Sequence, residues 1–126
     1  MNLLLSIKPE FAEKIFDGTK RYEFRRTIFK RQDINKVIVY ASSPVQKVIG
    51  EFEIAAILQC EIKELWKRTR HQSGISEDYF LNYFSDRHSG FAIKIKNAAR
   101  YKTQYCIHKH FGICPPQSYA YVDKTE

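Results

Sequence analysis

The sequence contains no apolar run that approaches the length of a membrane-spanning helix. Its opening, MNLLLSIKPEF, has an apolar stretch too short for the core of a signal peptide, and a Lys-Pro-Glu triplet interrupts that stretch. Cysteine is scarce, with three residues, an odd number in a chain without an export signal. Such thiols are expected to be reduced. These absences argue against a secreted or membrane-spanning protein and predict a cytoplasmic one with no membrane partner.

Acidic residues are missing from a long part of the second half of the chain. Between Arg87 and Val122 the sequence has six basic residues and no Asp or Glu, and between Gly18 and Lys36 it has seven basic residues against two acids. The whole chain carries 21 Lys and Arg against 14 Asp and Glu, a net charge of +7. Such an excess suggests a partner that bears phosphate groups, and the two basic segments are expected to share one surface.

Low-complexity tracts, repeats and linkers are also absent, so the 126 residues are expected to form a single domain, residues 1–126. A hydrophobic content of 44% is sufficient for a buried core. Alternating, β-branched or extended segments predict strands at residues 3–7, 19–26, 36–42, 47–58, 90–97 and 115–122.

Three helices are expected between these strands. The first follows the first strand, with Pro9 at its first position and Gly18 at a left-handed stop. A short helix is expected in EIKELWKRTRHQSG and another in SEDYFLNYF, where Ser76 is the N-cap. Short turns between neighbouring strands favour an antiparallel or mixed sheet. The predicted fold class is α+β, a small mixed β-barrel of about six strands with helices capping its ends.

The segment KTQYCIHKHF and the residues after it contain two cysteines and two histidines. If the segment is a strand, Cys106, His108 and His110 share a face, and Cys114 follows. These residue types bind zinc, but the sequence has neither a C-x-x-C nor an H-x3-H element here. The alternative is a strand edge with a buried thiol and solvated imidazoles. The sequence leaves both open, and no metal or cofactor is assigned to the protein.

The stretch with the densest charge is FDGTKRYEFRR, residues 16–26. In a regular strand the even-numbered residues from Lys20 to Phe24 share one face, while Arg21, Glu23 and Arg25 share the other. Lys and Arg donate to phosphate oxygens, Glu accepts from base amino groups, and Tyr stacks on bases. The stretch is therefore either a solvated face or a site for an anionic ligand.

Five segments carry a resemblance to a known family. They are SIKPEFAEKIFDGTKRYEFRR, VYASSP, VIGEFE, SEDYFLNYF and PPQSYAYV, in that order, over nearly the whole chain. The first of them contains the pattern Gly-x-Lys-x-x-Glu-x-Arg at Gly18, Lys20, Glu23 and Arg25. Together they resemble the ASCH (activating signal cointegrator homology) domain family of the PUA-like superfamily. The resemblance implies a small PUA-like barrel with a cleft beside its first helix.

The resemblance also implies that this cleft binds RNA or a modified nucleotide, in RNA metabolism or transcript regulation. RNA or a modified nucleotide is thus the expected partner, while a protein partner is left open. The residues expected to bind the ligand are Lys8, Lys20, Tyr22, Glu23, Arg25, Arg26, Ser42 and Ser43. The structural alternative is that Glu23 pairs with a neighbouring arginine on the surface and that the serines cap a turn before Pro44.

A small hydrolase is the alternative function. One branch of the superfamily resembles enzymes that remove acyl groups from N4-acylated cytidine with a Lys, a Thr three residues later and a distant Glu. Lys20 matches the Lys, but Glu23 stands at the Thr position, so the hydroxyl is missing. The nearby carboxylate also favours a charged Lys20, which is a poor base. A ribonuclease is a further alternative, and under either hydrolase hypothesis Lys20 and Glu23 are the catalytic residues. The sequence leaves open whether the protein is an enzyme.

Overall fold

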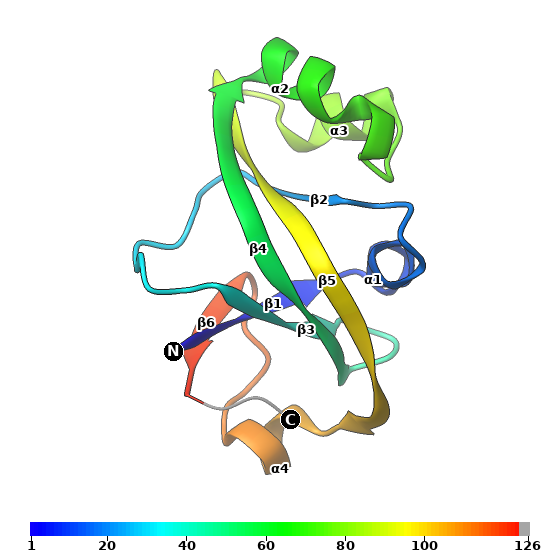
Figure 1. Ribbon diagram of the computed structural model, residues 1–126, viewed down its shortest axis with the longest axis vertical. Coiled ribbons are helices and arrows are strands. Elements are labelled where there is room, and N and C mark those ends of the chain that lie inside the picture. Colours follow the sequence, from blue (N-terminus) through cyan, green and yellow to red (C-terminus); the bar gives the residue numbers. More distant parts are fainter. Residues whose placement is uncertain (124–126) are drawn as a thin grey trace.

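Two long strands, β4 (Lys47–Glu61) and β5 (Ser89–Tyr105), pair antiparallel into a twisted ribbon that runs along the molecule (Figure 1). This computed structural model describes residues 1–123, so the last three residues of the predicted domain lie outside the described part. Register shifts along the ribbon, one of them between Val48 and Gly50, mark β-bulges, which increase the twist of a strand pair. The other strands and helices are arranged around this ribbon.

Four shorter strands complete one six-stranded sheet in the order β2-β5-β4-β3-β1-β6. β1 and β3 run parallel, and the other neighbouring pairs are antiparallel. The predicted α+β class and mixed sheet are therefore confirmed. The shorter strands are β1 (Asn2–Ile7), β2 (Tyr22–Arg25), β3 (Lys36–Ala41) and β6 (Tyr119–Val122).

The predicted β-barrel is wrong, because the sheet is open and does not close into a barrel. Strands β2 and β6 form its two edges and do not pair with each other. β2 is four residues long, and β6 follows Pro115 and Pro116, which have no backbone N–H to donate to a neighbouring strand. A hydrogen-bonded ladder therefore does not join the two edges.

Helix α1 (Pro9–Asp17) begins and ends where its sequence predicts. Pro9 occupies the first turn, where a missing N–H costs nothing, and Gly18 adopts the left-handed conformation, φ 88°, that ends the helix. Ala12 and Ile15 are buried and belong to the main hydrophobic core, together with side chains of β1, β3 and β5. This packing fixes α1 against the sheet, so that the residues after Gly18 enter β2 at a defined place.

Helices α2 (Ile62–Thr69) and α3 (Glu77–Tyr83) lie at one end of the ribbon, joined through the 3-10 turn η1 (Arg70–Gln72) (Figure 1). Ser76 caps α3 as predicted, because its hydroxyl accepts a hydrogen bond from the backbone N–H of Tyr79 at 3.1 Å. A separate hydrophobic core connects these helices to β2 and β5. It contains Tyr22, Phe24, Leu65, Phe80, Phe84 and Ala92.

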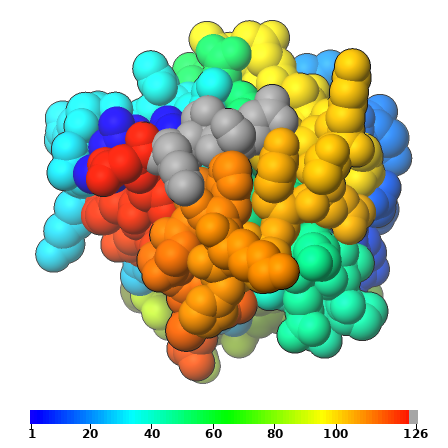
Figure 2. All heavy atoms as spheres, turned by 90° about the horizontal axis from the view of Figure 1, so that it is seen from below, coloured from blue at the N-terminus to red at the C-terminus, as the bar shows by residue number. Residues whose placement is uncertain are grey.

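The opposite end of the ribbon differs from the sequence prediction. β5 extends beyond the predicted strand to Tyr105, and helix α4 (Ile107–Phe111) then follows in place of a continued strand. Gly112, with φ 70°, ends this helix. Figure 2 shows α4 and the segment after it covering this end of the molecule, beside the turn between β3 and β4. The helix removes the common face that Cys106, His108 and His110 would have shared in a strand.

The cysteine and histidine residues near α4 do not form a metal site in the described part of the chain. Cys114 Sγ lies 3.7 Å from Nε2 of His108, and all three cysteines are free thiols. Within residues 1–123, no group of three or more His, Cys, Asp or Glu residues is arranged to hold a metal ion. Among the same residues, no helix combines the length and the apolar character that crossing a membrane requires.

Candidate functional site

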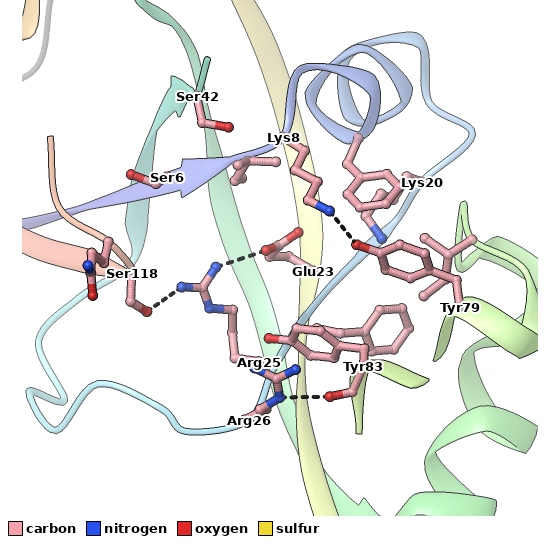
Figure 3. Close-up of a pocket in the computed structure, with 15 residues that line it drawn as sticks. Ser6, Lys8, Lys20, Glu23, Arg25, Arg26, Ser42, Tyr79, Tyr83 and Ser118 are labelled. Carbon is pink, nitrogen blue, oxygen red and sulfur yellow. Dashed lines mark hydrogen bonds and ion pairs between the residues drawn. The ribbon is translucent and has the colours of Figure 1, made fainter. Parts of the chain in front are cut away.

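A cavity of about 420 Å³ opens between the end of β1, helix α1, strand β2, helix α3 and the segment before β6 (Figure 3). Its lining comes from both halves of the chain, so the cavity forms only when the whole sheet and its helices are assembled. Most of the lining side chains are basic, aromatic or hydroxyl-bearing. They are Ser6, Ile7, Lys8, Phe11, Lys20, Glu23, Phe24, Arg25, Arg26, Ser42, Ile75, Tyr79, Tyr83, Gln117 and Ser118.

Lys20 is a deeply buried charged residue of the cavity, with 2% of its surface exposed. Its Nζ donates a hydrogen bond to the carbonyl oxygen of Ser73 at 2.8 Å. The ammonium also lies 4.9 Å from the ring centre of Phe24 and 5.3 Å from that of Phe11, within the range of cation–π attraction. Burial lowers the pKa of Lys20 from 10.5 to about 8, and the charge of Glu23 opposes this shift. Near neutral pH, Lys20 is therefore mostly charged but can release its proton.

Glu23 and Arg25 form an ion pair inside the cavity. Arg25 Nη1 donates to Glu23 Oε2 at 3.1 Å, and 12% of the Arg25 side chain and 9% of the Glu23 side chain are exposed. Arg25 Nη2 also donates to the hydroxyl of Ser118 (Figure 3). Because Arg25 lies on β2 and Ser118 directly precedes β6, this one side chain bridges the two open edges of the sheet. The Glu23–Arg25 pair expected as a surface alternative thus exists, but it lies in the cavity.

The rim of the cavity combines cations with tyrosines. Lys8 Nζ donates to the hydroxyl of Tyr79 at 3.0 Å, and this bond holds the pKa of Lys8 above its ordinary value. Arg26 Nε donates to the backbone carbonyl of Tyr83 at 2.7 Å, and its guanidinium lies 4.3 Å from the centre of the Tyr83 ring. Burial raises the pKa of the Tyr83 hydroxyl. Both rim cations are therefore held in place by the neighbouring helix α3.

The charges of the lining residues favour an anionic ligand. Lys8, Lys20, Arg25 and Arg26 supply four positive charges against the one negative charge of Glu23, a net charge of +3 when all are ionised. Serine hydroxyls and aromatic rings complete the walls. A cavity of this composition can bind a phosphate through its cations and a flat heterocycle through its rings.

Six of the eight residues that the sequence assigned to a ligand site line this one cavity: Lys8, Lys20, Glu23, Arg25, Arg26 and Ser42. Tyr22 does not, because it is 5% exposed and packs in the core between β2 and the helices, with its ring 6.2 Å from that of His71. Ser43 is exposed and is not part of the lining. The predicted alternation of faces does not extend to Lys20, since β2 begins at Tyr22.

Sequence analysis missed several residues of the cavity. Tyr79 and Tyr83 lie four residues apart on α3, a spacing that places them on the same face of a helix and that the sequence could have shown. Ser6 and Ser118 had no such signal. The backbone N–H of Ser6 donates to the carbonyl of Ser118 at 3.1 Å, and the Ser6 hydroxyl donates to the carbonyl of Pro116. These contacts join distant parts of the chain and follow only from the fold.

The fold belongs to a known class of domain. Residues 5–106 match the family model of the ASCH domain, and the chain belongs to the ASCH domain family. It is 33% identical over 94 residues to an ASCH domain-containing ribonuclease of Zymomonas mobilis, a match that covers 75% of this chain and 64% of that protein. It is 32% identical over 101 residues to a Ureaplasma parvum protein named ATP synthase subunit alpha, which covers 79% of this chain and 12% of that protein. The chain thus matches less than two thirds of the length of either relative.

Solved structures share the same fold. The crystal structure of ASCH from Zymomonas mobilis matches with a TM-score of 0.89 at 28% identity, covering 98% of this chain and 88% of that chain. A mutant form of ZmASCH from the same organism gives a TM-score of 0.90 at 28% identity, covering 98% of this chain and 89% of that chain. The family resemblance predicted from the sequence is therefore confirmed.

Proposed function

We propose that this ASCH domain binds unpaired RNA, or a single modified nucleotide, in the cavity between α1, β2 and α3. The observation that carries the proposal is the convergence of Lys8, Lys20, Arg25 and Arg26 with several aromatic rings on one hollow of about 420 Å³. A phosphate supplies the negative charge that these cations attract, and a base supplies the flat surface that the rings accept. The ribonuclease name of the Zymomonas mobilis relative supports an RNA-related role.

The rim and the interior of the cavity are suited to different parts of a nucleotide. Lys8 and Arg26 at the rim are placed to meet phosphate oxygens, since their side chains are partly exposed and already oriented by Tyr79 and Tyr83. The rings of Tyr79 and Tyr83 offer surfaces for an unstacked base. Duplex RNA would not present a free base to such a hollow, so the ligand is single-stranded.

Fluorescence anisotropy with a short labelled RNA tests this proposal. The wild-type protein is expected to bind single-stranded RNA, and Arg26→Ala is expected to weaken binding roughly tenfold by removing one charged hydrogen-bond donor. Lys63→Ala, which removes an exposed lysine of α2 outside the cavity lining, is the matched control and should leave affinity nearly unchanged. Equal loss in both variants would show that general positive charge, rather than the cavity, holds the RNA.

RNA cleavage is the second candidate, favoured by the titration of Lys20. A pKa of about 8 leaves a useful fraction of neutral amine near physiological pH, as a general base requires. Neutral Lys20 would take the proton of a ribose 2′-hydroxyl, and the 2′-oxygen would attack the adjacent phosphorus. A 2′,3′-cyclic phosphate forms, the bond to the 5′-oxygen breaks, and water protonates that oxygen. Arg25 would stabilise the charge that develops on the phosphate.

A gel assay with labelled RNA decides between binding alone and cleavage. Lys20→Arg keeps the positive charge but removes a group that can lose its proton, so it is expected to abolish cleavage while RNA binding persists. RNA with a 2′-deoxy nucleotide at the cut position should resist cleavage, because the attacking hydroxyl is missing. N4-acetylcytidine incubated in parallel tests the amidohydrolase alternative that uses Lys20 and Glu23. Intact RNA at high concentrations of the wild-type protein would leave binding as the function.

A further inference from the structure

Glu23 is an acid at the centre of a basic cavity, and its position needs a chemical reason. The residue is 7% exposed, and its Oε2 accepts a hydrogen bond from Arg25 at 3.1 Å. In the part of the chain that the structure describes, no hydrogen bond occupies Oε1. A buried carboxylate with a free oxygen facing a hollow is a strong acceptor that a ligand with N–H groups would satisfy.

Lys20 and Glu23 line the same cavity without contacting each other. The charge of Glu23 acts on Lys20, yet the ion pairs formed by residues 1–123 do not include one between these two side chains. One ammonium hydrogen of Lys20 is used by Ser73, so the others are available as donors. The cavity therefore presents an acceptor and a donor among its lining side chains to a ligand that enters it.

The edges of the four RNA bases differ in how they fit an acceptor beside a donor. Guanine carries two adjacent donors, N1–H and the 2-amino group, next to the acceptor O6. Uracil has one N–H on its pairing edge, and adenine and cytosine each have one amino group beside a ring nitrogen acceptor. A carboxylate can accept from two neighbouring N–H groups only when the base is guanine. A phosphate in this place would be repelled by the carboxylate, which keeps the RNA backbone at the rim.

We infer that the cavity selects guanine in unpaired RNA, with Glu23 accepting from N1–H and the 2-amino group and Lys20 donating to O6. This inference rests on the proposed RNA-binding function and names the nucleotide that the site prefers. The rings of Tyr79 and Tyr83 provide surfaces for the base, and Lys8 and Arg26 meet the flanking phosphates. Glu23 is thus the residue that determines specificity, and Arg25 positions it.

The test compares short uridine-rich RNAs that differ at one central position, which is G, A, C, U or inosine. The wild-type protein is expected to bind the guanine RNA roughly tenfold more tightly than the A, C and U forms. Inosine keeps N1–H and O6 but lacks the 2-amino group, so it should lose most of that preference. The inosine comparison needs no protein variant and therefore does not depend on whether a substitution folds.

Glu23→Gln provides the second arm, with Glu64→Gln on the exposed face of α2 as the matched control. The amide offers a donor where guanine also has donors, so the preference for guanine should fall to about threefold or less. Binding of the uridine RNA should persist in the Glu64→Gln control.

Each outcome bears on the inference. Similar wild-type affinity for all five RNAs, or a preference for another base, overturns guanine selection while RNA binding stands. If the inosine RNA binds as tightly as the guanine RNA, or if Glu23→Gln keeps the full preference for guanine, Glu23 is not the cause of that preference. Either result overturns the inference. Failure of the wild-type protein to bind any of these RNAs overturns the proposed function itself, and the inference with it.

Discussion

Nζ of Lys20 donates a hydrogen bond to the carbonyl oxygen of Ser73, 53 residues further along the chain, at 2.8 Å. Lys20 stands just before β2, and Ser73 lies in the link between α2 and α3. The contact therefore joins the residue just before β2 to the segment that leads into α3, which forms another wall of the cavity. Because the bond is buried, changes in either segment are expected to be felt at the candidate site.

Gly74→Ala is expected to disturb this contact from the Ser73 side. A Cβ at Gly74 would lie 2.5 Å from Lys20 Cβ and 2.7 Å from Lys20 Cγ, and Gly74 has φ +70°. Backbone strain and overpacking together should lower the free energy of unfolding by about 3 kcal/mol. Urea denaturation of the variant measures the loss.

Gly112→Ala is the control for that prediction, since Gly112 has the same φ of +70° but nothing within 4 Å of an added Cβ. The Gly112→Ala variant has the backbone strain of a positive φ without a steric clash, so its free energy of unfolding should fall by about 1 kcal/mol. Similar losses in the two variants would mean that the Lys20 side chain yields without cost and that the packing around it is loose.

The stability of the protein should depend on pH through Lys20. The pKa of Lys20 is lowered from 10.5 to about 8, so below pH 8 the lysine is charged in both folded and unfolded states and its burial penalty is fully present. Between pH 8 and 10.5 the unfolded chain binds more protons, and the free energy of unfolding therefore rises with pH. Lys20→Met should lack this contribution, which is about 3 kcal/mol at most. Parallel pH curves for the wild-type protein and the variant in urea denaturation would contradict the assigned pKa.

Salt should weaken RNA binding, and the steepness of this dependence gives the number of phosphate contacts. For single-stranded RNA the logarithm of affinity falls with the logarithm of salt concentration, by about 0.7 per contacted phosphate. Lys8→Ala and Arg26→Ala are each expected to reduce the magnitude of that slope by about this amount, because each removes one rim cation. Titrations at several salt concentrations measure the slope. A slope that matches that of the Lys63→Ala control would place the phosphate contacts outside the cavity.

Arg25→Gln should leave the buried Glu23 carboxylate without its cation. The free energy of unfolding is expected to fall by about 2 kcal/mol, because the buried Glu23 carboxylate is then no longer stabilised by a nearby positive charge. Adding Glu23→Gln to Arg25→Gln removes that charge as well, so the double variant should recover part of the loss. Thermal or urea denaturation of the four proteins gives the coupling energy of the pair. Additive effects of the two substitutions would indicate that Glu23 and Arg25 act independently.

The sequence predicted those features that local chemistry determines. Pro9, Gly18 and Ser76 set helix boundaries through their own backbone preferences, and the Gly-x-Lys-x-x-Glu-x-Arg pattern placed Lys20, Glu23 and Arg25 in one region. Features that depend on distant segments were not accessible. The link from Arg25 to Ser118 joins positions 93 residues apart, and no periodicity encodes it.

Local patterns were insufficient at two places. The sequence predicted a β-barrel, but the sheet is open: β6 pairs with β1 and β2 pairs with β5, so these two strands form its edges. The sequence left open whether the segment after Tyr105 is a strand, and the structure has a short helix there, which ends at Gly112 and buries Ile107 in the same core cluster as Tyr40 and Val48. Tertiary packing outweighed local preference in both places.

The two unpaired margins of the sheet both contribute to the cavity, through Arg25 on β2 and Ser118 just before β6. The hydrogen bond from Arg25 to the Ser118 hydroxyl connects these margins through side chains, where a closed barrel would connect them through backbone hydrogen bonds. A side-chain contact can be broken without disturbing a strand pair, so the wall of the cavity can adjust to a ligand while the sheet keeps its register.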